Sequence, residues 1–232
     1  MVKKMEQITE IIIAYIHTDY NEKFGIPRQS GLAPSVQGRI VFQPEFRDPE
    51  AVRGLEGFSH IWLIWEFSEN RGKAWSPTVR PPRLGGNRRM GVFATRSPFR
   101  PNPIGLSCVE LVSVEGTELV IAGADLVDGT PIFDIKPYVP YADAHPEALA
   151  GFAPDPGATL RVDFPPEKLA QIPPAKREAL RGVLANDPRP RYQRDPERVY
   201  TLSFAGFEVS FTVRDETLTV TAVRAGGERL RD

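Results

Sequence analysis

The sequence predicts a mainly β protein in which an all-β barrel or sandwich, reaching to about residue 140, is followed by a small α+β unit. Two observations predict the first part. Short runs rich in β-branched and aromatic residues follow one another, and Gly and Pro separate them with few helical periods between. One observation predicts the second part: near Asp143 the chain becomes Ala- and Pro-rich, and a helical pattern follows.

The expected strands of the first part are apolar runs bounded by turn residues. The run FSHIWLIWEF is aromatic and apolar enough for a buried strand. The turn Glu115-Gly116-Thr117 predicts a hairpin, and residues 48–55 are typical of a short helix. The expected strands cover residues 8–16, 36–42, 58–67, 91–95, 104–114 and 118–127.

The second part follows the stretch ADAHPEALAGFAPDPGA, which is typical of a linker or a loop crossing. Leu180, Val183 and Leu184 have the i, i+3, i+4 spacing of one helix face. The pattern therefore predicts two domains, residues 1–145 and 146–232. In the second domain we expect a strand over 159–164, helical structure over 166–185 and a three-stranded meander over 199–223, with turns at Ala205-Gly206 and Asp215-Glu216.

The composition is that of a soluble globular protein. Of 232 residues, 41% are hydrophobic and 25% are charged, and no apolar run approaches the roughly 18 residues of a membrane span. The start MVKKMEQITE lacks the apolar stretch of a signal peptide. The single cysteine, Cys108, excludes an internal disulfide, and its place in the apolar run IGLSCVEL favours a core position over a nucleophile. We expect a cytoplasmic protein.

Charge is segregated along the chain although the net charge is only −1. Residues 70–109 carry eight basic side chains and no acidic one, whereas residues 110–155 carry nine acidic side chains and one basic one, Lys136. A positive face would attract phosphate backbones. The alternative is that both runs are solvated faces that interleave in the fold, and the sequence does not decide between them.

The stretch GVFATRSPFRPNPIGLS indicates a ligand-binding loop. Three prolines in six residues fix φ and withhold backbone donors, so residues 98–103 should form a stiff loop rather than a central strand. That loop displays Arg96, Arg100 and Asn102. Other segments with displayed polar groups are IPRQSGL, RPPRLGGNRRMG, LVDGTPIFDIKPYVP and NDPRPRY.

The usual catalytic templates are absent from the sequence. It has no Gly-rich phosphate loop, no GxSxG elbow, no GxGxxG after a strand and no Cys/His set with metal spacing, so we expect no metal site. His60 lies inside an apolar run, and without further information it reads as a core histidine. The Asp128-Gly129 turn is common, so that pair alone is a weak signal.

Taken together, PRQSGL, GLEGFSHIW, RPPRLGGNRRMGVFATRSPFRPNPIGLS, DLVDGTPIFDIKPYVPYAD and NDPRPRY resemble the TsaA-like (TrmO-type) family. Its members are S-adenosylmethionine-dependent tRNA (adenine-N6)-methyltransferases acting on N6-threonylcarbamoyladenosine at position 37. The resemblance implies a small single-sheet β-barrel that binds the methyl donor without a Rossmann sheet, and a homodimer with the donor site near the subunit interface. It covers nearly the whole chain, including the C-terminal unit with the DPRP motif.

The resemblance also implies which positions hold S-adenosyl-L-methionine. Within the stiff loop, we infer that Arg96 would bind the donor carboxylate while Arg100 and Asn102 would face the incoming nucleotide; this division of roles is not part of the resemblance. The implied donor-binding residues are Pro27, Arg28, Gln29, His60, Ile61, Arg96, Leu106, Asp128, Gly129, Thr130 and Pro131.

Methyl transfer from a sulfonium is an in-line displacement, so alignment of donor and acceptor supplies most of the rate gain, roughly 7–11 kcal/mol. In the modified adenosine N6 belongs to a urea, so a general base would help. The candidate catalytic residues are Asp128, Asp187 and Asn102, although Asp187 could instead cap a turn and pair with Arg189. The candidate RNA contacts are Arg88, Arg89, Arg100, Arg189, Arg191 and Tyr192.

Two alternatives remain open from the sequence. One is a methyltransferase that uses the same donor site on another RNA or on a small acceptor. The other is a donor-binding RNA-binding module without catalytic activity.

Overall fold

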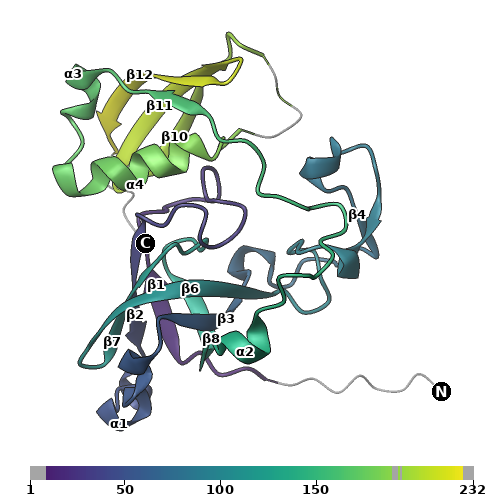
Figure 1. The fold of residues 1–232 in the computed structure, drawn as a ribbon, viewed down its shortest axis with the longest axis vertical. Helices are drawn as coiled ribbons and strands as arrows, with labels where there is room; N and C mark the ends of the chain where they lie inside the picture. The colour runs from purple at the N-terminus through teal and green to yellow at the C-terminus, as the bar shows by residue number, and fades with distance from the viewer. Residues whose placement is uncertain (1–8, 190–192, 194, 227–232) are drawn as a thin grey trace.

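The computed structural model describes residues 9–189, 193 and 195–226 of the chain. Figure 1 shows two units, a barrel formed by β1–β3 and β6–β8 and a sheet with helices formed by β9–β12, α3 and α4. A third feature, the short β4 segment, projects beside them (Figure 1). The mainly β prediction is confirmed.

The first unit is a closed barrel with the strand order β1-β2-β7-β6-β3-β8. All of its pairings are antiparallel. Because side chains alternate between the two faces of a strand, every second residue points inward, and Ile16, Ile40, Leu63, Ile121 and Ile132 are fully buried in its core. The strands are β1 (Ala14–His17), β2 (Gln37–Phe42), β3 (His60–Glu66), β6 (Ile104–Glu115), β7 (Glu118–Ala122) and β8 (Thr130–Pro137).

Several expected strands differ from the observed ones. Among residues 91–95, only Gly91 is in a strand, the two-residue β5 (Met90–Gly91), which pairs with β4 (Thr78–Val79), and a 3-10 turn follows it. Strand β8 was not anticipated, because Pro131 and Pro137 bound it and proline is usually excluded from central strands. Cys108 is not in the barrel core, since it is half-buried on the outer face of β6.

Short helical turns connect the barrel strands. Helix α1 (Pro49–Val52) confirms the helix expected over 48–55, and Asp48 caps it by accepting from Glu50 N at 2.9 Å. Helix α2 (Pro140–Asp143) follows β8. The 3-10 turns are Pro44–Phe46, Leu55–Gly57, Ser68–Asn70, Pro82–Leu84 and Val92–Ala94.

The second unit is a four-stranded sheet with the order β10-β11-β12-β9. The meander is confirmed as β10 (Tyr200–Phe204), β11 (Phe207–Arg214) and β12 (Thr217–Ala225), and β9 (Arg161–Asp163) joins it in parallel with β12. The helical stretch is divided into α3 (Pro166–Leu169) and α4 (Pro174–Ala185), because Pro173 and Pro174 interrupt it. The apolar face of α4 packs with the sheet in one core.

Residues 18–36 connect the two units physically. Tyr20 is fully buried with its ring 5.8 Å from Phe204, and Ala205 N donates to Asp19 O at 2.9 Å. Further along, Asn186 Nδ2 donates to Leu32 O at 2.7 Å. The segment that carries the PRQSGL motif is therefore packed into the core of the C-terminal unit (Figure 1). The boundary near residue 145 stays a prediction.

Candidate active site

A cavity of about 470 Å³ opens at the end of the barrel. Four segments form its wall: the PRQSGL segment, the end of β3 with the turn after it, the proline-rich loop with the start of β6, and the 125–130 turn before β8. These segments lie far apart in the sequence, and barrel closure brings them together. Its wall is formed by Lys23, Ile26, Pro27, Arg28, Gln29, Trp65, Glu66, Phe67, Ser68, Glu69, Thr95, Arg96, Pro98, Arg100, Ile104, Gly105, Leu106, Asp125, Val127, Asp128 and Thr130.

Most of the sequence-predicted donor positions meet in this cavity. Two others, Gly129 and Pro131, adjoin it in the turn before β8 but do not line it. Gly129 has φ 76°, a conformation that favours glycine, so its contribution is to the shape of the turn. The predicted residues that line the cavity are Pro27, Arg28, Gln29, Arg96, Leu106, Asp128 and Thr130.

His60 and Ile61 are not brought to the cavity, which corrects the expectation that they belong with the other donor positions. They begin β3, whereas the cavity lies at its other end, roughly 20 Å away at about 3.3 Å per residue. Ile61 is fully buried inside the barrel. His60 is exposed, with Nδ1 3.0 Å from Ser59 Oγ, so it is not a core histidine either.

Ser68 and Glu69 line the cavity in place of His60 and Ile61. They form the 3-10 turn that directly follows β3. They were not selected from the sequence, because the residues chosen there lie at the start of β3 and these follow its end. The available signal was the change from apolar to polar residues after Phe67, which marks where the chain leaves the barrel wall.

The proline-rich loop presents its polar side chains in different ways. Arg96 is exposed, and its guanidinium donates to Gln29 Oε1, so two predicted donor positions are hydrogen-bonded to each other across the cavity. Arg100 donates to Val92 O at 3.1 Å and to Thr95 O at 2.7 Å. Arg100 therefore fixes the shape of the loop, which was not anticipated. Asn102 is exposed and does not line the cavity.

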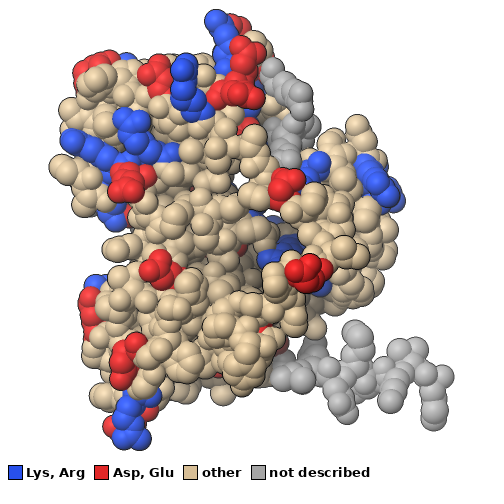
Figure 2. All heavy atoms as spheres, viewed as in Figure 1, with Lys and Arg blue, Asp and Glu red and all other residues tan. Residues whose placement is uncertain are grey.

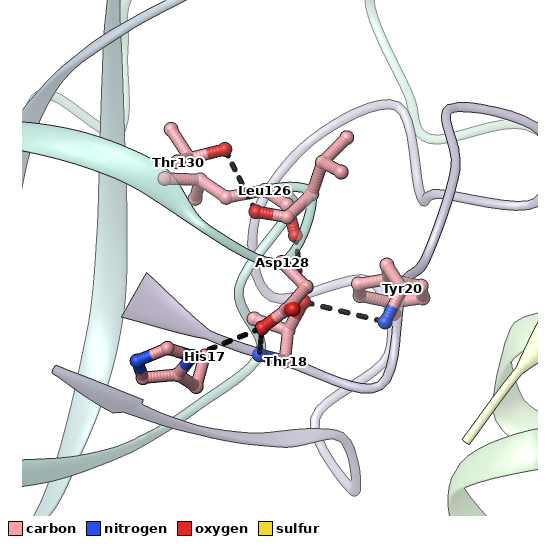
Figure 3. A network of polar contacts seen from close by, with 7 residues as sticks. His17, Thr18, Tyr20, Leu126, Asp128 and Thr130 are labelled. Atoms are coloured by element: carbon pink, nitrogen blue, oxygen red, sulfur yellow. Dashed lines mark hydrogen bonds and ion pairs between the residues drawn. The ribbon is translucent and has the colours of Figure 1, made fainter. Parts of the chain in front are cut away.

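Asp128 is fixed by the end of β1. One carboxylate oxygen lies 3.2 Å from His17 Nδ1 and accepts from Thr18 N at 3.2 Å (Figure 3). Thr18 Oγ1 also donates to Leu126 O at 3.1 Å, and Gly129 N donates to Ile16 O at 2.8 Å. The LVDGT turn is thereby attached to the barrel rim at several points.

The two glutamates of the cavity wall are ion-paired. Glu66 is buried and accepts from Arg71 Nε at 2.7 Å, with a second contact from the same guanidinium. Glu69 lies 2.7 Å from Lys23 Nζ. Both negative charges are therefore compensated by neighbouring cations.

Asp125 belongs to a buried chain of hydrogen bonds beneath the cavity. Trp65 Nε1 donates to Ser107 Oγ at 3.0 Å, and Ser107 Oγ donates to Asp125 Oδ1 at 2.6 Å. Burial raises the pKa of the Asp125 carboxyl; the Ser107 hydroxyl and the charge of Arg96 lower it only in part. Sequence reasoning did not single out Asp125, which lies three residues before Asp128 in an apolar run.

Gly105 permits this arrangement. A Cβ at position 105 would lie 2.2 Å from Cε2 of the Trp65 indole, well inside van der Waals contact. The indole lies directly on the β6 backbone, and its hydrogen bond to Ser107 holds it there. Only glycine at this position leaves room for the ring that forms the cavity floor.

The basic residues predicted to contact RNA are distributed over two parts of the molecule. Arg88 and Arg89 are exposed in the segment between β4 and β5. Arg189 follows α4 and forms a bidentate ion pair with Asp187, at 2.8 and 3.0 Å. Two interpretations of Asp187 were open from the sequence, a catalytic residue or a turn cap paired with Arg189, and the pair with Arg189 is the one observed. Arg191 and Tyr192 lie outside the described residues.

A second groove, of about 920 Å³, adjoins the cavity wall. Arg28 lines both, and its guanidinium donates to Arg189 O at 3.4 Å. Arg83 also lines the groove and pairs with Asp155 at 2.7 Å, so the basic and acidic stretches of the sequence interleave in part. Figure 2 shows the surface hollowed beside the β4 segment, with Lys or Arg side chains inside the hollow.

Two kinds of feature are absent from the part of the chain that the structure describes. Over the ranges given above, no helix has the length and apolar character needed to cross a bilayer. Within the same ranges, no group of three or more His, Cys, Asp or Glu side chains is arranged to hold a metal ion.

Comparison with known proteins identifies the family. Residues 15–144 match the tRNA-methyltransferase O N-terminal domain, and residues 157–226 match the TrmO C-terminal domain. The tRNA (adenine(37)-N6)-methyltransferase of Escherichia coli K12 is 44% identical over 224 residues, which are 91% of this chain and 95% of that protein. The enzyme of the same name from Eikenella corrodens is 49% identical over 172 residues, covering 72% of this chain and 98% of that protein.

Solved structures agree with the sequence comparison. A crystal structure of TrmO from Pseudomonas aeruginosa has a TM-score of 0.80 at 34% identity and covers 95% of this chain and 100% of that one. A second TrmO structure has a TM-score of 0.81 at 37% identity and covers 97% of this chain. The fold of the barrel and that of the C-terminal unit are therefore both shared with these proteins. The chain belongs to the TrmO family and is a tRNA (adenine(37)-N6)-methyltransferase.

Proposed function

We propose that the chain transfers a methyl group from S-adenosyl-L-methionine to N6 of N6-threonylcarbamoyladenosine at position 37 of tRNA. The observation that carries the donor assignment is the convergence of cationic and anionic side chains on one cavity of about 470 Å³. The donor carries a carboxylate at one end and a positive sulfonium near its middle. Arg28 and Arg96 suit the carboxylate, and Asp128 suits the positive charge.

We place the donor on the seven predicted residues that line the cavity, with Ser68 and Glu69 added and with His60 and Ile61 omitted. Gly129 and Pro131 would act by keeping the turn in shape. When bound, the donor supplies an electrophilic methyl group, and the side chains of the wall orient it toward the acceptor. Asp128 stays a candidate catalytic residue in this arrangement because it lies on the cavity wall.

Asp187 and Asn102 have weaker support as catalytic residues. The Asp187 carboxylate is occupied by Arg189, and neither residue lines the cavity. The Asp187–Arg189 pair instead fits a role in shaping the backbone beside Arg28, because Asp187 has φ 49° at the end of α4 and Arg189 O accepts from Arg28. We expect Asp187→Asn to weaken tRNA binding more than it slows transfer.

The function is tested with radiolabelled methyl donor and bulk tRNA from cells that make the threonylcarbamoyl modification and from cells that lack it. Label in the modified tRNA alone is expected. Label in unmodified tRNA, in another RNA or in a small molecule would assign a different acceptor. Binding of S-adenosylhomocysteine without any transfer would indicate a non-catalytic RNA-binding module.

For RNA binding we propose the exposed Arg88 and Arg89 together with Arg189 beside the groove of about 920 Å³, which Arg28 joins to the cavity. Each phosphate contact releases counterions, so tRNA affinity should fall as salt rises. Between 50 and 200 mM salt, a group of a few such contacts should lower the affinity by on the order of tenfold or more. Arg88→Ala and Arg89→Ala should weaken tRNA binding and leave the affinity for S-adenosylhomocysteine unchanged. Arg100, Arg191 and Tyr192 remain predicted contacts.

We also propose that the chain acts as a homodimer in the cytoplasm. The outer face of β6 exposes a row of apolar side chains, Ile104, Leu106 and Val112, and Leu106 reaches the cavity wall. A second copy on this face would cover the row and bring the interface next to the donor. Light scattering of the purified chain tests it: a dimer is expected, and Val112→Glu should give a monomer.

A further inference from the structure

Asp125 differs from the other acidic side chains of the cavity in its partners. Glu66, Glu69 and Asp128 each lie within ion-pair distance of an Arg, Lys or His side chain. Asp125 accepts instead from a neutral hydroxyl, that of Ser107, and among the described residues it makes no ion pair. It is the acid of the cavity wall whose charge is least compensated.

This difference leaves Asp125 as the carboxylate of the cavity wall that no cation among the described residues contacts directly, so it is the one best placed to accept a proton. A cation in contact with a carboxylate stabilises its charged form and weakens its hold on a proton. Burial acts in the opposite direction and raises the pKa of the Asp125 carboxyl, and the Ser107 hydroxyl, the backbone amides of Asp125 and Ser30 and the charge of Arg96 offset this only in part. A carboxylate raised toward neutral pH is suited to general-base catalysis.

We propose that Asp125 is the general base that accepts the N6 proton of the acceptor adenosine, an inference that rests on the proposed function. In the transfer, N6 forms a bond to the methyl carbon as the carbon–sulfur bond breaks, and the electron pair of that bond stays on sulfur, which becomes neutral. The N6 proton passes to the Asp125 carboxylate. The resulting carboxylic acid returns the proton to solvent after product release.

Ser107 and Trp65 are positioning residues for this base. Because the Trp65 N–H donates to the oxygen of Ser107, the hydroxyl hydrogen of Ser107 is directed to Asp125. The Ser107 hydroxyl thereby holds Oδ1 of Asp125 in place, and Ser107 itself is only 2% exposed. Trp65, Gly105 and Asp125 all line the cavity. The series of hydrogen bonds from Trp65 through Ser107 to Asp125 therefore reaches the cavity surface.

The groups around Asp125 determine how it titrates. Arg96 approaches from the proline-rich loop and favours the charged form, whereas Tyr20 is neutral and buried, and its own pKa is raised by burial and by Asp125. The remaining neighbours do not titrate near neutral pH: Ser107 from β6, Trp65 from β3 through Ser107, and the backbone of Ser30 from the PRQSGL segment. If the transfer rate falls at low pH with the slope of a single ionisation, we therefore assign that ionisation to Asp125.

The test measures single-turnover methyl transfer to modified tRNA by the full-length protein. Asp125→Asn should slow transfer by about 100- to 1,000-fold, because general-base catalysis contributes on that order, and its affinities for S-adenosylhomocysteine and tRNA should stay within about threefold of wild type. Asp134→Asn is the matched control, since Asp134 lies on β8 in an exposed pair with Lys136 and does not line the cavity. A transfer rate of Asp125→Asn close to that of the control would overturn the proposal.

The pH dependence of the same rate gives a second readout that does not require Asp125→Asn to fold. In wild type the rate should rise with pH through a limb above the ordinary aspartate pKa of about 3.9 and then level off. Ser107→Ala should move that limb to higher pH, because the hydroxyl favours the charged carboxylate. A limb that stays in place in Ser107→Ala, or that persists in Asp125→Asn, would contradict the assignment.

The measurement on the wild-type protein distinguishes a failure of this inference from a failure of the proposed function. If wild type methylates a different acceptor, the substrate proposal fails, and the comparison of Asp125→Asn with Asp134→Asn is made on that acceptor. If wild type binds S-adenosylhomocysteine but transfers to no acceptor, both the function and the role of Asp125 are wrong.

Discussion

At each end of β3 a tryptophan N–H supports an aspartate through hydrogen bonds, but the pKa values of the two aspartates are shifted in opposite directions. At the start of the strand, Trp62 Nε1 donates to Asp143 Oδ2 at 3.1 Å, and at its end Trp65 Nε1 donates through Ser107 to Asp125. Both indoles therefore support an aspartate. Yet the backbone amide of Val139 and the indole of Trp62 lower the pKa of Asp143, whereas burial raises the pKa of Asp125.

The two carboxyls differ in the effect that dominates their pKa, which is hydrogen bonding at Asp143 and loss of hydration at Asp125. Asp143 ends a short helix, and its direct hydrogen bonds from Val139 N and the Trp62 indole outweigh its own loss of hydration. Asp125 accepts a short hydrogen bond from Ser107 as well, but the loss of water around it outweighs that contact. Support from a tryptophan indole therefore accompanies a lowered pKa at Asp143 and a raised pKa at Asp125.

The largest effect is expected from changing the glycine that makes the cavity end of β3 possible. Gly105→Ala places a methyl group inside the Trp65 indole, so the ring must leave its site on β6. We expect a loss of folding free energy at the upper end of roughly 1–3 kcal/mol and a loss of donor binding. Thermal unfolding and calorimetric titration with S-adenosylhomocysteine measure the two effects.

Gly57→Ala is the matched change near the other end of the strand. A Cβ at Gly57 would meet nothing within 4 Å, so stability should be unchanged or slightly increased, by at most about 1 kcal/mol. If Gly105→Ala were tolerated as well as Gly57→Ala, the indole could not be fixed against the β6 backbone as described.

The next effect concerns the donor itself. Arg96→Ala should weaken binding of S-adenosylhomocysteine by about 1.5–3 kcal/mol, roughly 10- to 150-fold, because a carboxylate loses a charged hydrogen-bond donor. His60→Ala, at the other end of β3, should leave the affinity unchanged. The opposite result, with His60→Ala weakening binding and Arg96→Ala neutral, would move the donor site to the start of the strand.

The smallest effect is a pH-dependent change in stability at the start of β3. Asp143→Asn should lower the melting temperature at pH 7, because the charged form of Asp143 accepts from Val139 N and Trp62. Since the pKa is lowered on folding, this stabilisation is complete above the unfolded pKa of about 3.9 and is lost as pH falls through the folded pKa. The melting temperatures of variant and wild type should therefore converge in acid, with donor affinity unchanged throughout. A difference that grows in acid would reverse the sign of the effect.

Much of the fold was predictable because local patterns specify it. Apolar and aromatic runs bounded by turn residues predicted β2, β3, β6 and β7, and the turns at Ala205-Gly206 and Asp215-Glu216 lie where the sequence placed them. Strand β8 was missed because its prolines argue against a strand when considered alone. The Pro131 nitrogen cannot donate to the ladder, and only the closed barrel gives this segment strand partners on both sides, β1 and β3.

The candidate site was predictable only as far as motifs identify it. The PRQSGL, RSPFRPNPIGL and LVDGTP motifs do converge on one cavity. Their sequences could not reveal that Arg100 holds the loop through backbone carbonyls, or that Asp125 lies on the cavity wall and accepts from Ser107. Both facts depend on how segments distant in the sequence meet, which no local spacing encodes.

The central claim is that the donor binds at the Trp65 end of β3, and the three tryptophans of the chain allow it to be tested directly. Trp65 lines the cavity, Trp62 lies three residues earlier in β3 and does not line it, and Trp75 is exposed in the segment before β4. In a spectrum of the nitrogen-labelled indole N–H groups, assigned with single Trp→Phe variants, titration with S-adenosylhomocysteine should shift the Trp65 signal and leave the Trp62 signal in place. A shift of the Trp62 signal with an unchanged Trp65 signal would contradict this account.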